Sequence, residues 1–413
     1  MIRNPGHPVR HHATRVLRCL LVILISTWVL AVGHVAAQQG GGDLQLHSKA
    51  AVVIDAASGR VLYEKNAHEP LPPASVTKVM TLILALEAIE RGEATWDELV
   101  TASARAASMG GTQIWLETGE QMAYGDLLWA IAVGSANDAA VAIAEHLAGS
   151  EAAFAEMMNE RARELGAQNT HFLNASGLPP ADVGMTGEHV TSAYDIAIIS
   201  RHALTLPKFR ELVSTWGPVV MRPNGSGEPV LWSLNSMLRT YPGMDGIKTG
   251  YTREAGYNLS ATAERQGVRV IAVNLGAATP DQRQADIQRL LDYGFSQLTS
   301  VPVAKAGEEL TVVRVRRGLP AALPVTVKED VFATVLSRQN ETPEIRFEWP
   351  LEGVVAPVKQ GDQVGTLVVT VNGIEVGRHP LIAAGDVEEA RFSKLFIRNL
   401  HALLSGTRIG EVQ

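Results

Sequence analysis

Two kinds of hydrophobic pattern alternate along the chain. Over 51–65, two short apolar runs flank an Ala-Ser-Gly turn, which is typical of a β-hairpin. From Ser75 to about Ile89, apolar residues recur at helical spacing and predict a helix. Further helical patterns cover 124–148, 151–165, 192–204 and 280–297. Strand patterns cover 244–252, 256–263 and 268–277. The region 44–298 therefore mixes helices with strands.

A long connection precedes the helical pattern at 192–204. Residues 171–190, "HFLNASGLPPADVGMTGEHV", are rich in glycine, proline and polar residues. Loops of this length inside a compact domain are usually functional. Directly after the connection, Ser192 and Asp195 have the spacing of a capping box, which predicts the start of a helix.

The pattern changes near residue 300. From 301 to 384 the chain is rich in valine, alternates between apolar and polar positions, and is interrupted by glycine and proline. This pattern predicts the short strands of a small β-sandwich. The region holds no cluster of catalytic residue types, so we interpret it as a structural or docking module.

The two ends of the chain carry patterns of another kind. Residues 1–37 combine arginines, an apolar run from Cys19 to Val32 and small residues near Ala37, as in a secretory signal peptide. A retained membrane anchor is the alternative, although the run is short for a spanning helix. Over 387–405, apolar residues form one stripe of a helix, which suits a helix in a membrane surface or one packed on the β module. We favour the membrane surface, and we expect an exported protein in the periplasm or at the outer face of the cytoplasmic membrane.

Composition narrows the chemistry. The 413 residues carry 36 basic and 43 acidic side chains, a formal net charge of −7, which is a poor footprint for nucleic acid. The single cysteine, Cys19, lies in the predicted signal peptide, so the exported chain would have no disulfide and no thiol nucleophile. The sequence contains no glycine-rich phosphate loop and no run of His and Asp with ligand spacing. We therefore expect neither a metal nor a nucleotide cofactor.

The first candidate pair is Ser75 and Lys78 in "PPASVTKVMT". Three residues apart on a helix, their side chains share a face, so the amine can act as a base for the hydroxyl. A lysine does so at neutral pH only if burial or a neighbouring cation lowers its pKa. The residues after Lys78 are apolar enough to bury it. The ordinary alternative is the start of a surface helix.

A second candidate pair is Ser135 and Asn137 in "AVGSANDAA". It offers a hydroxyl that can pass a proton and an amide that can hold a substrate carbonyl. The sequence Ser233-Leu234-Asn235 is a competing occurrence of the same spacing, without a helix after it. For either one, a helix cap or a turn is the ordinary explanation.

A third candidate motif lies in "GMDGIKTGYT". If this segment is a strand, alternation places Lys248, Gly250 and Thr252 on one face. Lys248 would supply positive charge, Gly250 would let a substrate backbone come close, and Thr252 would supply a hydroxyl. A lysine on an edge strand is the ordinary alternative.

The three motifs in this order point to one family. The combination Ser-x-x-Lys, Ser-x-Asn and Lys-Thr-Gly is typical of penicillin-binding proteins and class A β-lactamases. Residues 45–390 resemble the low-molecular-mass penicillin-binding proteins that are serine-type D-alanyl-D-alanine carboxypeptidases of the peptidase S11 type, through "SVTKVMT", "GSANDAA", "THFLNASGL" and "YPGMDGIKTGYTREAGYNL". The resemblance implies an α/β (α+β) fold of the β-lactamase/transpeptidase type, with an antiparallel sheet between helical layers, followed by an all-β domain and an amphipathic helix.

The resemblance also implies an activity. It implies removal of the terminal D-alanine from peptidoglycan pentapeptides through an acyl-enzyme, which β-lactam antibiotics would also form. Ser75 would be the nucleophile, Lys78 its base, and Ser135 the relay of a proton to the leaving amine.

The same resemblance assigns substrate-binding roles. Asn137 would orient the substrate, Lys248 would help to place its carboxylate, and the backbone N–H groups of Ser75 and Tyr251 would form an oxyanion hole. The remaining residues of the substrate-binding strand are Thr249, Gly250 and Thr252. Two positions depart from the family pattern.

Ala136 stands where the family usually has glycine, a change we expect to be tolerated. Leu234 stands where some relatives have an arginine that binds the substrate carboxylate. Arg222 and Arg239 lie on either side of it, and the sequence assigns the role to neither.

Three alternatives remain at this point. A β-lactamase would need a second carboxylate to activate water, and Glu164, the nearby candidate, lies in a helical pattern. A D,D-endopeptidase would carry the same motifs. A weakly active murein-binding protein would act through the β module, although the intact Ser75, Lys78, Ser135 and Lys248 argue against it.

Overall fold

The computed structural model describes residues 44–222 and 228–390. The predicted signal peptide lies outside the described residues, and so does most of the predicted helix at 387–405. The start of that helix is wrong, because Glu388–Glu389 form a short strand, β19, that pairs with β12 (Gly318–Leu319). No helix in the described ranges is long and apolar enough to cross a membrane.

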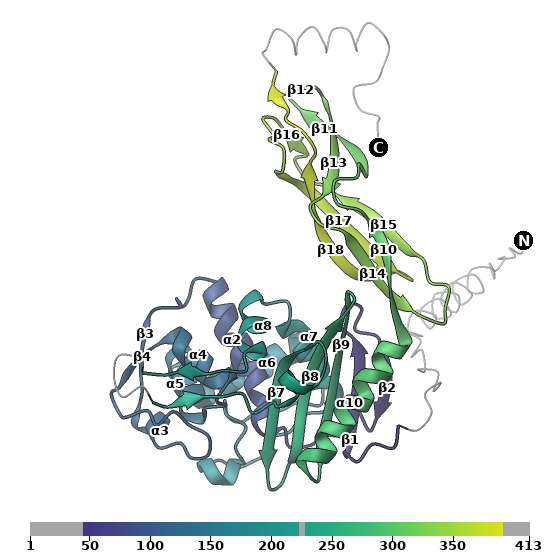
Figure 1. The fold of residues 1–413 in the computed structure, drawn as a ribbon. Coiled ribbons are helices and arrows are strands. Elements are labelled where there is room, and N and C mark those ends of the chain that lie inside the picture. Colours follow the sequence, from purple (N-terminus) through teal and green to yellow (C-terminus); the bar gives the residue numbers. More distant parts are fainter. Residues whose placement is uncertain (1–43, 223–227, 391–413) are drawn as a thin grey trace, which may run out of the picture. The chain divides into compact units, whose positions relative to one another are not determined.

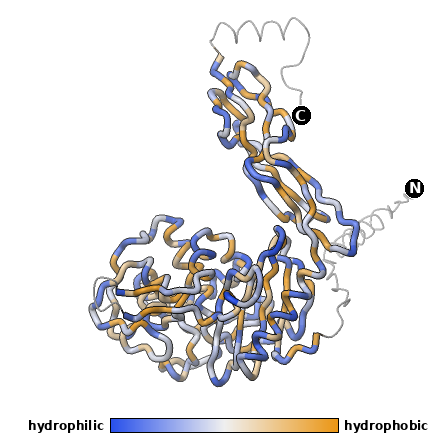
Figure 2. The backbone as a smooth tube through the Cα atoms, in the orientation of Figure 1, coloured by the Kyte–Doolittle hydropathy of each residue, from blue (hydrophilic) through white to orange (hydrophobic). Residues whose placement is uncertain are grey.

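A five-stranded antiparallel sheet forms the centre of the first domain (Figure 1). In spatial order its strands are β2 (Val61–Lys65), β1 (Ala50–Asp55), β9 (Val268–Ala277), β8 (Gly256–Arg265) and β7 (Met244–Thr252). The predicted hairpin and the three predicted strands are all confirmed. Figure 2 shows a hydrophilic turn between β8 and β9, while apolar residues follow the strands.

Helices cover both faces of this sheet (Figure 1). One face packs on α10 (Pro280–Gln297), and the other packs on α7 (Ala193–Ala203) and α8 (Pro207–Ser214). Behind these lies α2 (Lys78–Glu90), which contacts three further helices: α4 (Tyr124–Ala132), α5 (Asn137–Ala148) and α6 (Glu151–Glu164). The shorter elements are η1 (Ala74–Thr77), β3 (Leu99–Thr101), α3 (Ala104–Ala107), β4 (Gln121–Ala123), η2 (Pro180–Val183), β5 (Val219–Val220), β6 (Val230–Leu231) and α9 (Met237–Thr240). The predicted sheet between helical layers is thus confirmed.

Two of the predicted helices differ from the pattern, one at its start and one in its middle. The helix expected from Ser75 begins as the 3₁₀ turn η1, and the α-helix starts only at Lys78. The helical pattern over 124–148 is interrupted after α4 and resumes with α5 at Asn137. Hydrophobic spacing cannot separate these cases, because both sides of each break face the same core. Each break holds a residue of the candidate site.

The helix α7 begins as expected, but its capping box is one-sided. The Ser192 side chain accepts a hydrogen bond from Asp195 N at 3.1 Å. The Asp195 carboxylate does not return to Ser192 and accepts instead from Asn169 N at 2.7 Å and Thr170 Oγ1 at 2.8 Å. Asp195 therefore fixes the beginning of the long connection over 171–190.

The second domain is all β, as the valine-rich alternation predicts. Its six-stranded sheet has the order β15 (Pro343–Glu348), β17 (Gln363–Val371), β18 (Ile374–Ala383), β13 (Ala322–Val327), β11 (Thr311–Arg316) and β16 (Val354–Val355). Beside it, β10 (Leu298–Ala304) pairs with β14 (Val331–Leu336). Its core consists mainly of valine side chains.

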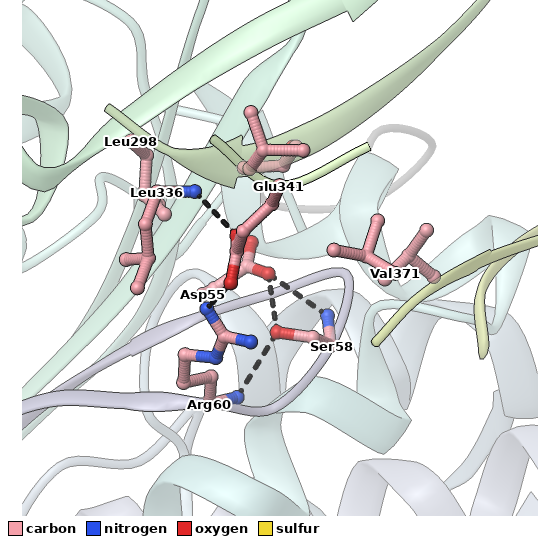
Figure 3. Close-up of a pocket in the computed structure, with 10 residues that line it drawn as sticks. Asp55, Ser58, Arg60, Leu298, Leu336, Glu341 and Val371 are labelled. Atoms are coloured by element: carbon pink, nitrogen blue, oxygen red, sulfur yellow. Dashed lines mark hydrogen bonds and ion pairs between the residues drawn. The ribbon is translucent and has the colours of Figure 1, made fainter. Parts of the chain in front are cut away.

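One carboxylate links residues of the two domains. Glu341 lies beyond β14, and its side chain is almost fully buried. It accepts hydrogen bonds from Arg60 Nη1 and from Leu336 N, both at 2.8 Å (Figure 3). The nearby Asp55 carboxylate accepts from Ser58 N at 3.0 Å and closes the turn between β1 and β2.

Candidate active site

The Ser75 hydroxyl and the Lys78 amine are in direct contact. In a 3₁₀ turn the side chains at i and i+3 lie one above the other, and η1 places Lys78 Nζ 3.1 Å from Ser75 Oγ. Ser75 is half-buried while Val76, Thr77 and Lys78 around it are buried. The serine is thus the member of this turn that a substrate can reach.

Lys78 has two further partners besides the serine. Its Nζ lies 2.6 Å from Asn137 Oδ1 and 2.7 Å from the Ser176 carbonyl oxygen. An ammonium would donate to all three oxygens. A neutral amine has two hydrogens and one lone pair, so it can donate to Asn137 and Ser176 and turn its lone pair to the Ser75 hydroxyl. The three partners can therefore be satisfied by either form of the lysine.

The electrostatic setting favours that neutral form. Burial, and next the charge of Lys248, hold the pKa of Lys78 well below its ordinary value, and the opposing influence of Asp138 is smaller. Lys78 is completely buried. The sequence-based condition for a lysine base is met.

The Ser135–Asn137 motif occupies the break between α4 and α5. Ser135 has a φ of +59°, and its carbonyl accepts from Thr112 Oγ1 at 2.7 Å. Asn137 is the first residue of α5, and its Nδ2 donates to the Gly110 carbonyl at 2.7 Å, which leaves Oδ1 to Lys78. The Ser135 hydroxyl has no hydrogen bond to Ser75 or Lys78 within the described ranges, so its relay role stays a prediction.

The Lys-Thr-Gly motif lies on β7, an edge strand of the sheet. The register pairs Lys248 with Ser260 and Gly250 with Asn258, so the predicted common face is confirmed. Lys248 is buried, and burial together with the charge of Arg283 lowers its pKa to about 7. It is therefore not the exposed lysine of an ordinary edge strand.

Glycine at 250 is required by a contact within the protein itself. A Cβ at Gly250 would lie 2.8 Å from the Pro73 carbonyl oxygen and 3.1 Å from Val76 N. The η1 backbone thus makes a close approach here, and the approach of a substrate backbone stays a prediction. The same contact places β7 directly beside the turn that carries Ser75.

Three residues next to Lys248 and Gly250 have distinct surroundings. Thr249 is buried, and its carbonyl accepts from Lys248 Nζ at 3.2 Å. Tyr251 is 56 % exposed and stacks on Tyr257 with ring centres 4.3 Å apart. Thr252 Oγ1 accepts from Ala255 N at 3.1 Å in the turn between β7 and β8. Their predicted substrate contacts, and the oxyanion hole at the N–H groups of Ser75 and Tyr251, remain predictions.

The 171–190 connection contributes to the site, as its length indicates. The Ser176 carbonyl contacts Lys78, and the Ala175 carbonyl accepts from Thr81 Oγ1 of α2 at 2.7 Å. Gly177 has a φ of +81°, and a Cβ there would lie 1.9 Å from the Ala74 carbonyl oxygen. A glycine is required because the connection is pressed onto the backbone beside Ser75.

Sequence reasoning missed His189 at the end of this connection. His189 Nδ1 accepts from Leu173 N at 3.1 Å, which leaves Nε2, 2.9 Å from Thr77 Oγ1, to carry the proton. Burial, with the charges of His171 and Lys78, lowers its pKa to about 3. It is a neutral brace for η1. A lone histidine in a polar loop gives no sequence signal for this.

Sequence reasoning also missed Arg283. This residue lies in the first turns of α10, is 8 % exposed, and its Nε has no hydrogen-bond partner among the described residues. Burial lowers its pKa, and its charge lowers the pKa of Lys248. The charge of Arg283 on α10 therefore influences Lys248 on β7. In the sequence, Arg283 is one arginine of a predicted helix and belongs to no recognisable motif, so nothing there indicates its role.

The residues weighed as alternatives have structural roles. Glu164 ends α6 and pairs with Arg161 on the surface. Asn235 donates to the Gly246 carbonyl at 3.4 Å. Arg222 is bonded to Glu120 at 2.9 Å, and Arg239 lies 5.5 Å from the centre of the Trp216 ring. No group of three or more His, Cys, Asp or Glu in the described ranges could hold a metal ion.

A buried lysine against a half-exposed serine, between a helical layer and the edge strand of an antiparallel sheet, defines the class of serine acyl-transfer enzymes with a lysine base. The family model "D-alanyl-D-alanine carboxypeptidase" of peptidase S11 matches residues 34–279, and that of the penicillin-binding protein 5 C-terminal domain matches 299–389. The chain belongs to the S11 family of D-alanyl-D-alanine carboxypeptidases, the low-molecular-mass penicillin-binding proteins.

Individual relatives agree with this. D-alanyl-D-alanine carboxypeptidase DacF of Bacillus subtilis is 37 % identical over 392 residues, 93 % of this chain and 98 % of the relative. Penicillin-binding protein 5 from Haemophilus influenzae is 28 % identical with a TM-score of 0.60, over 85 % of this chain and 100 % of that structure. Penicillin-binding protein D2 from Listeria monocytogenes in its ampicillin-bound form is 35 % identical with a TM-score of 0.55, over 62 % and 100 %.

Proposed function

We propose that this chain is a serine D,D-carboxypeptidase that removes the terminal D-alanine from peptidoglycan pentapeptides through an acyl-enzyme on Ser75. The observation that carries the proposal is the 3.1 Å contact between Ser75 Oγ and the buried amine of Lys78, whose pKa is lowered. A nucleophile held by a base of this kind is the general requirement for acyl transfer by serine.

Acylation follows from the contacts of Lys78. Ser75 Oγ attacks the carbonyl carbon of the penultimate D-alanine, and its proton passes to Lys78 Nζ. The tetrahedral intermediate breaks its C–N bond, and the leaving amine receives a proton from the Lys78 ammonium, with Ser135 as the proposed relay. Water then attacks the ester carbonyl and gives a proton to Lys78. The C–O bond to Ser75 breaks, Ser75 Oγ takes a proton from Lys78, and the shortened peptide leaves. β-Lactams would form the same ester.

The leaving D-alanine ends in a carboxylate, and we propose that Lys248 and Arg283 bind it. Both cations are buried, and neither has a carboxylate partner within the described ranges. Burying unpaired charge is unfavourable, and an incoming anion would relieve it. This assigns to Arg283 the role for which neither Arg222 nor Arg239 is available, because those two are held elsewhere.

We further propose that the protein acts outside the cytoplasm, with residues 1–37 removed and the segment after residue 390 at the membrane surface. The support is the sequence pattern of the two ends. Fractionation of cells that express the full chain, compared with a chain that stops at residue 390, tests the attachment.

The first test of the activity is D-alanine release from Nα,Nε-diacetyl-Lys-D-Ala-D-Ala by wild type and Ser75→Ala. We expect release by wild type and none by Ser75→Ala, with both variants folded by circular dichroism. A cross-linked muropeptide in parallel detects endopeptidase activity, and a chromogenic cephalosporin detects β-lactam hydrolysis. If a folded wild type cleaves the cross-linked muropeptide or the cephalosporin but not the diacetyl tripeptide, the carboxypeptidase proposal is wrong.

A further inference from the structure

Trp115 is an exposed aromatic residue in an unfavourable backbone conformation. Its side chain is 63 % exposed, and its φ is +57°. A bulky residue in the left-handed region is a genuine outlier. Such conformations persist only where the surroundings enforce them, and they cluster at functional sites.

Some other residues of the first domain with a positive φ lie at the proposed active site. Among its described non-glycine residues, the left-handed region holds Gln45, Asn66, Ala74, Trp115, Ser135 and Gln266. Ala74 precedes the proposed nucleophile, and Ser135 is the proposed relay. Trp115 is the single large apolar side chain in this set.

The backbone on both sides of Trp115 is held by a buried carboxylate. Asp138 Oδ2 accepts from Ile114 N at 3.0 Å and from Leu116 N at 3.1 Å. The side chains of Ile114 and Leu116 are buried, and Asp138 is completely buried. The side chain between them is therefore forced outward.

Arg222 holds the backbone at Trp115, and Gln113 holds the indole. Arg222, held by Glu120, donates to the carbonyl oxygens of Ile114 at 3.0 Å and Trp115 at 3.3 Å. With the Gln113 amide oriented so that both its atoms have partners, its oxygen accepts from Trp115 Nε1 at 3.1 Å. The exposed ring is thus presented in one orientation, at little entropic cost to a ligand.

The same loop borders the site on one side. The Thr112 carbonyl accepts from Asn137 N at 2.7 Å, and the Gly110 carbonyl accepts from Asn137 Nδ2 at 2.7 Å. Asn137 is the residue proposed to orient the acyl part of the substrate, whereas Lys248 is proposed to bind the carboxylate of the leaving D-alanine. The loop over 110–116 therefore contacts the residue proposed for the acyl side of the substrate.

We propose that Trp115 binds the aliphatic side chain of the residue that precedes D-Ala-D-Ala in the stem peptide. This inference rests on the proposed function. A dibasic residue at that position carries several methylenes and an amine. The face of an indole ring packs against methylenes and attracts a cation. Trp115 would thereby distinguish stem peptides with a long side chain from those without one.

The test compares two peptides, Nα-acetyl-Lys-D-Ala-D-Ala and Nα-acetyl-Ala-D-Ala-D-Ala, on wild type and Trp115→Gly. Glycine suits the left-handed φ, so this variant should fold with an unchanged or higher Tm. We expect wild type to prefer the lysyl peptide about tenfold in kcat/KM, because two or three methylenes leave water. In Trp115→Gly the ratio should fall to near one, with the alanyl peptide unaffected.

The control is Phe332→Ala, which removes another exposed aromatic side chain, from β14 of the all-β domain. It should keep the wild-type ratio. An unchanged ratio in Trp115→Gly, or an equal loss for both peptides, would overturn the inference, since the second result indicates a role in holding Asn137. If wild type releases D-alanine from neither peptide, the proposed function itself fails.

Discussion

The two domains differ in where their charged side chains lie, buried in the first and at the surface in the second. In the first domain the buried polar side chains include Lys78, Asp138, Asp195 and Lys248. In the described part of the all-β domain, the buried polar residues are two threonines, Thr326 and Thr334. Its ion pairs lie at the surface, as in the pairs Arg378–Glu375, Lys359–Asp386 and Arg317–Glu389. Glu341, paired with Arg60, is the exception.

This contrast separates the region that performs chemistry from the region that supports it. A charge at the surface is solvated and contributes little to stability. A buried lysine destabilises the fold but acquires the lowered pKa that a base needs. The first domain therefore carries a stability penalty at its site, and the all-β domain does not.

Replacing the buried base should have the largest effect. Lys78→Met keeps the volume and removes the amine, so acylation of Ser75 by a fluorescent penicillin should slow by about 10³-fold. Lys359→Met, which removes a surface lysine of the all-β domain, should acylate at the wild-type rate. Stopped-flow or gel-based labelling measures both. Acylation of Lys78→Met within tenfold of wild type would remove Lys78 from its role as base.

Loss of the second buried cation should affect substrates by their charge. For Arg283→Gln we expect a decrease of about 30- to 100-fold in kcat/KM for a peptide with a free terminal carboxylate, because a buried charge pair is lost. A peptide with an amidated terminus should be cleaved equally by both enzymes. Arg283→Lys should recover part of the activity. An equal loss on both peptides would indicate that Arg283 only supports the fold.

The two lysines should produce a bell-shaped pH profile. Lys78 must be neutral, so kcat/KM rises as pH increases through its lowered pKa. Lys248 must be charged to bind a carboxylate, so activity falls above about pH 7, by about tenfold per pH unit beyond its pKa. Lys248→Arg keeps the charge and should lose the alkaline decrease. A wild-type profile that is flat from pH 6 to pH 9 would contradict this assignment.

Removing a buried charge should also stabilise the fold. Below about pH 7, Lys248 is protonated in both the folded and the unfolded chain, so the full cost of burying its charge is present. Between pH 7 and 10.5 the lysine is protonated only in the unfolded chain. The free energy of unfolding of wild type therefore increases with pH in this range. Lys248→Met should therefore increase the free energy of unfolding by roughly 2 kcal/mol at pH 6 and by less at pH 9. Urea denaturation at both values measures this, and a gain that grows with pH would be the wrong sign.

A surface charge of the all-β domain should matter least. Arg378 pairs with Glu348 and Glu375 at exposed positions. Arg378→Ala should leave the urea midpoint of unfolding unchanged, because exposed pairs are weak. The same denaturation experiment in low and high salt provides the comparison. A clear decrease of the midpoint that disappears in high salt would show that this domain, too, depends on its charges.

Much of this architecture was predictable because it depends on local pattern. Alternation at 244–252 placed Lys248 and Gly250 on one face of a strand, and the register confirms it. The pair Ser75 and Lys78 was predicted from spacing, although the turn that joins them is 3₁₀. Spacing defines a shared face and does not define the pitch of the turn.

The sequence by itself determined the motifs, the order of elements and the two-domain division, since these follow from residue types and hydrophobic periodicity. The tertiary structure decided which charges are buried and what surrounds them. Lys78 meets Ser176, and Lys248 lies beside Arg283, only because chain folding brings distant segments together. Burial and pairing set a pKa, and neither is encoded in a residue's neighbours along the chain. For the same reason, the exposure of the Trp115 indole depends on Asp138 and Arg222, which are distant in the sequence and hold the backbone around it.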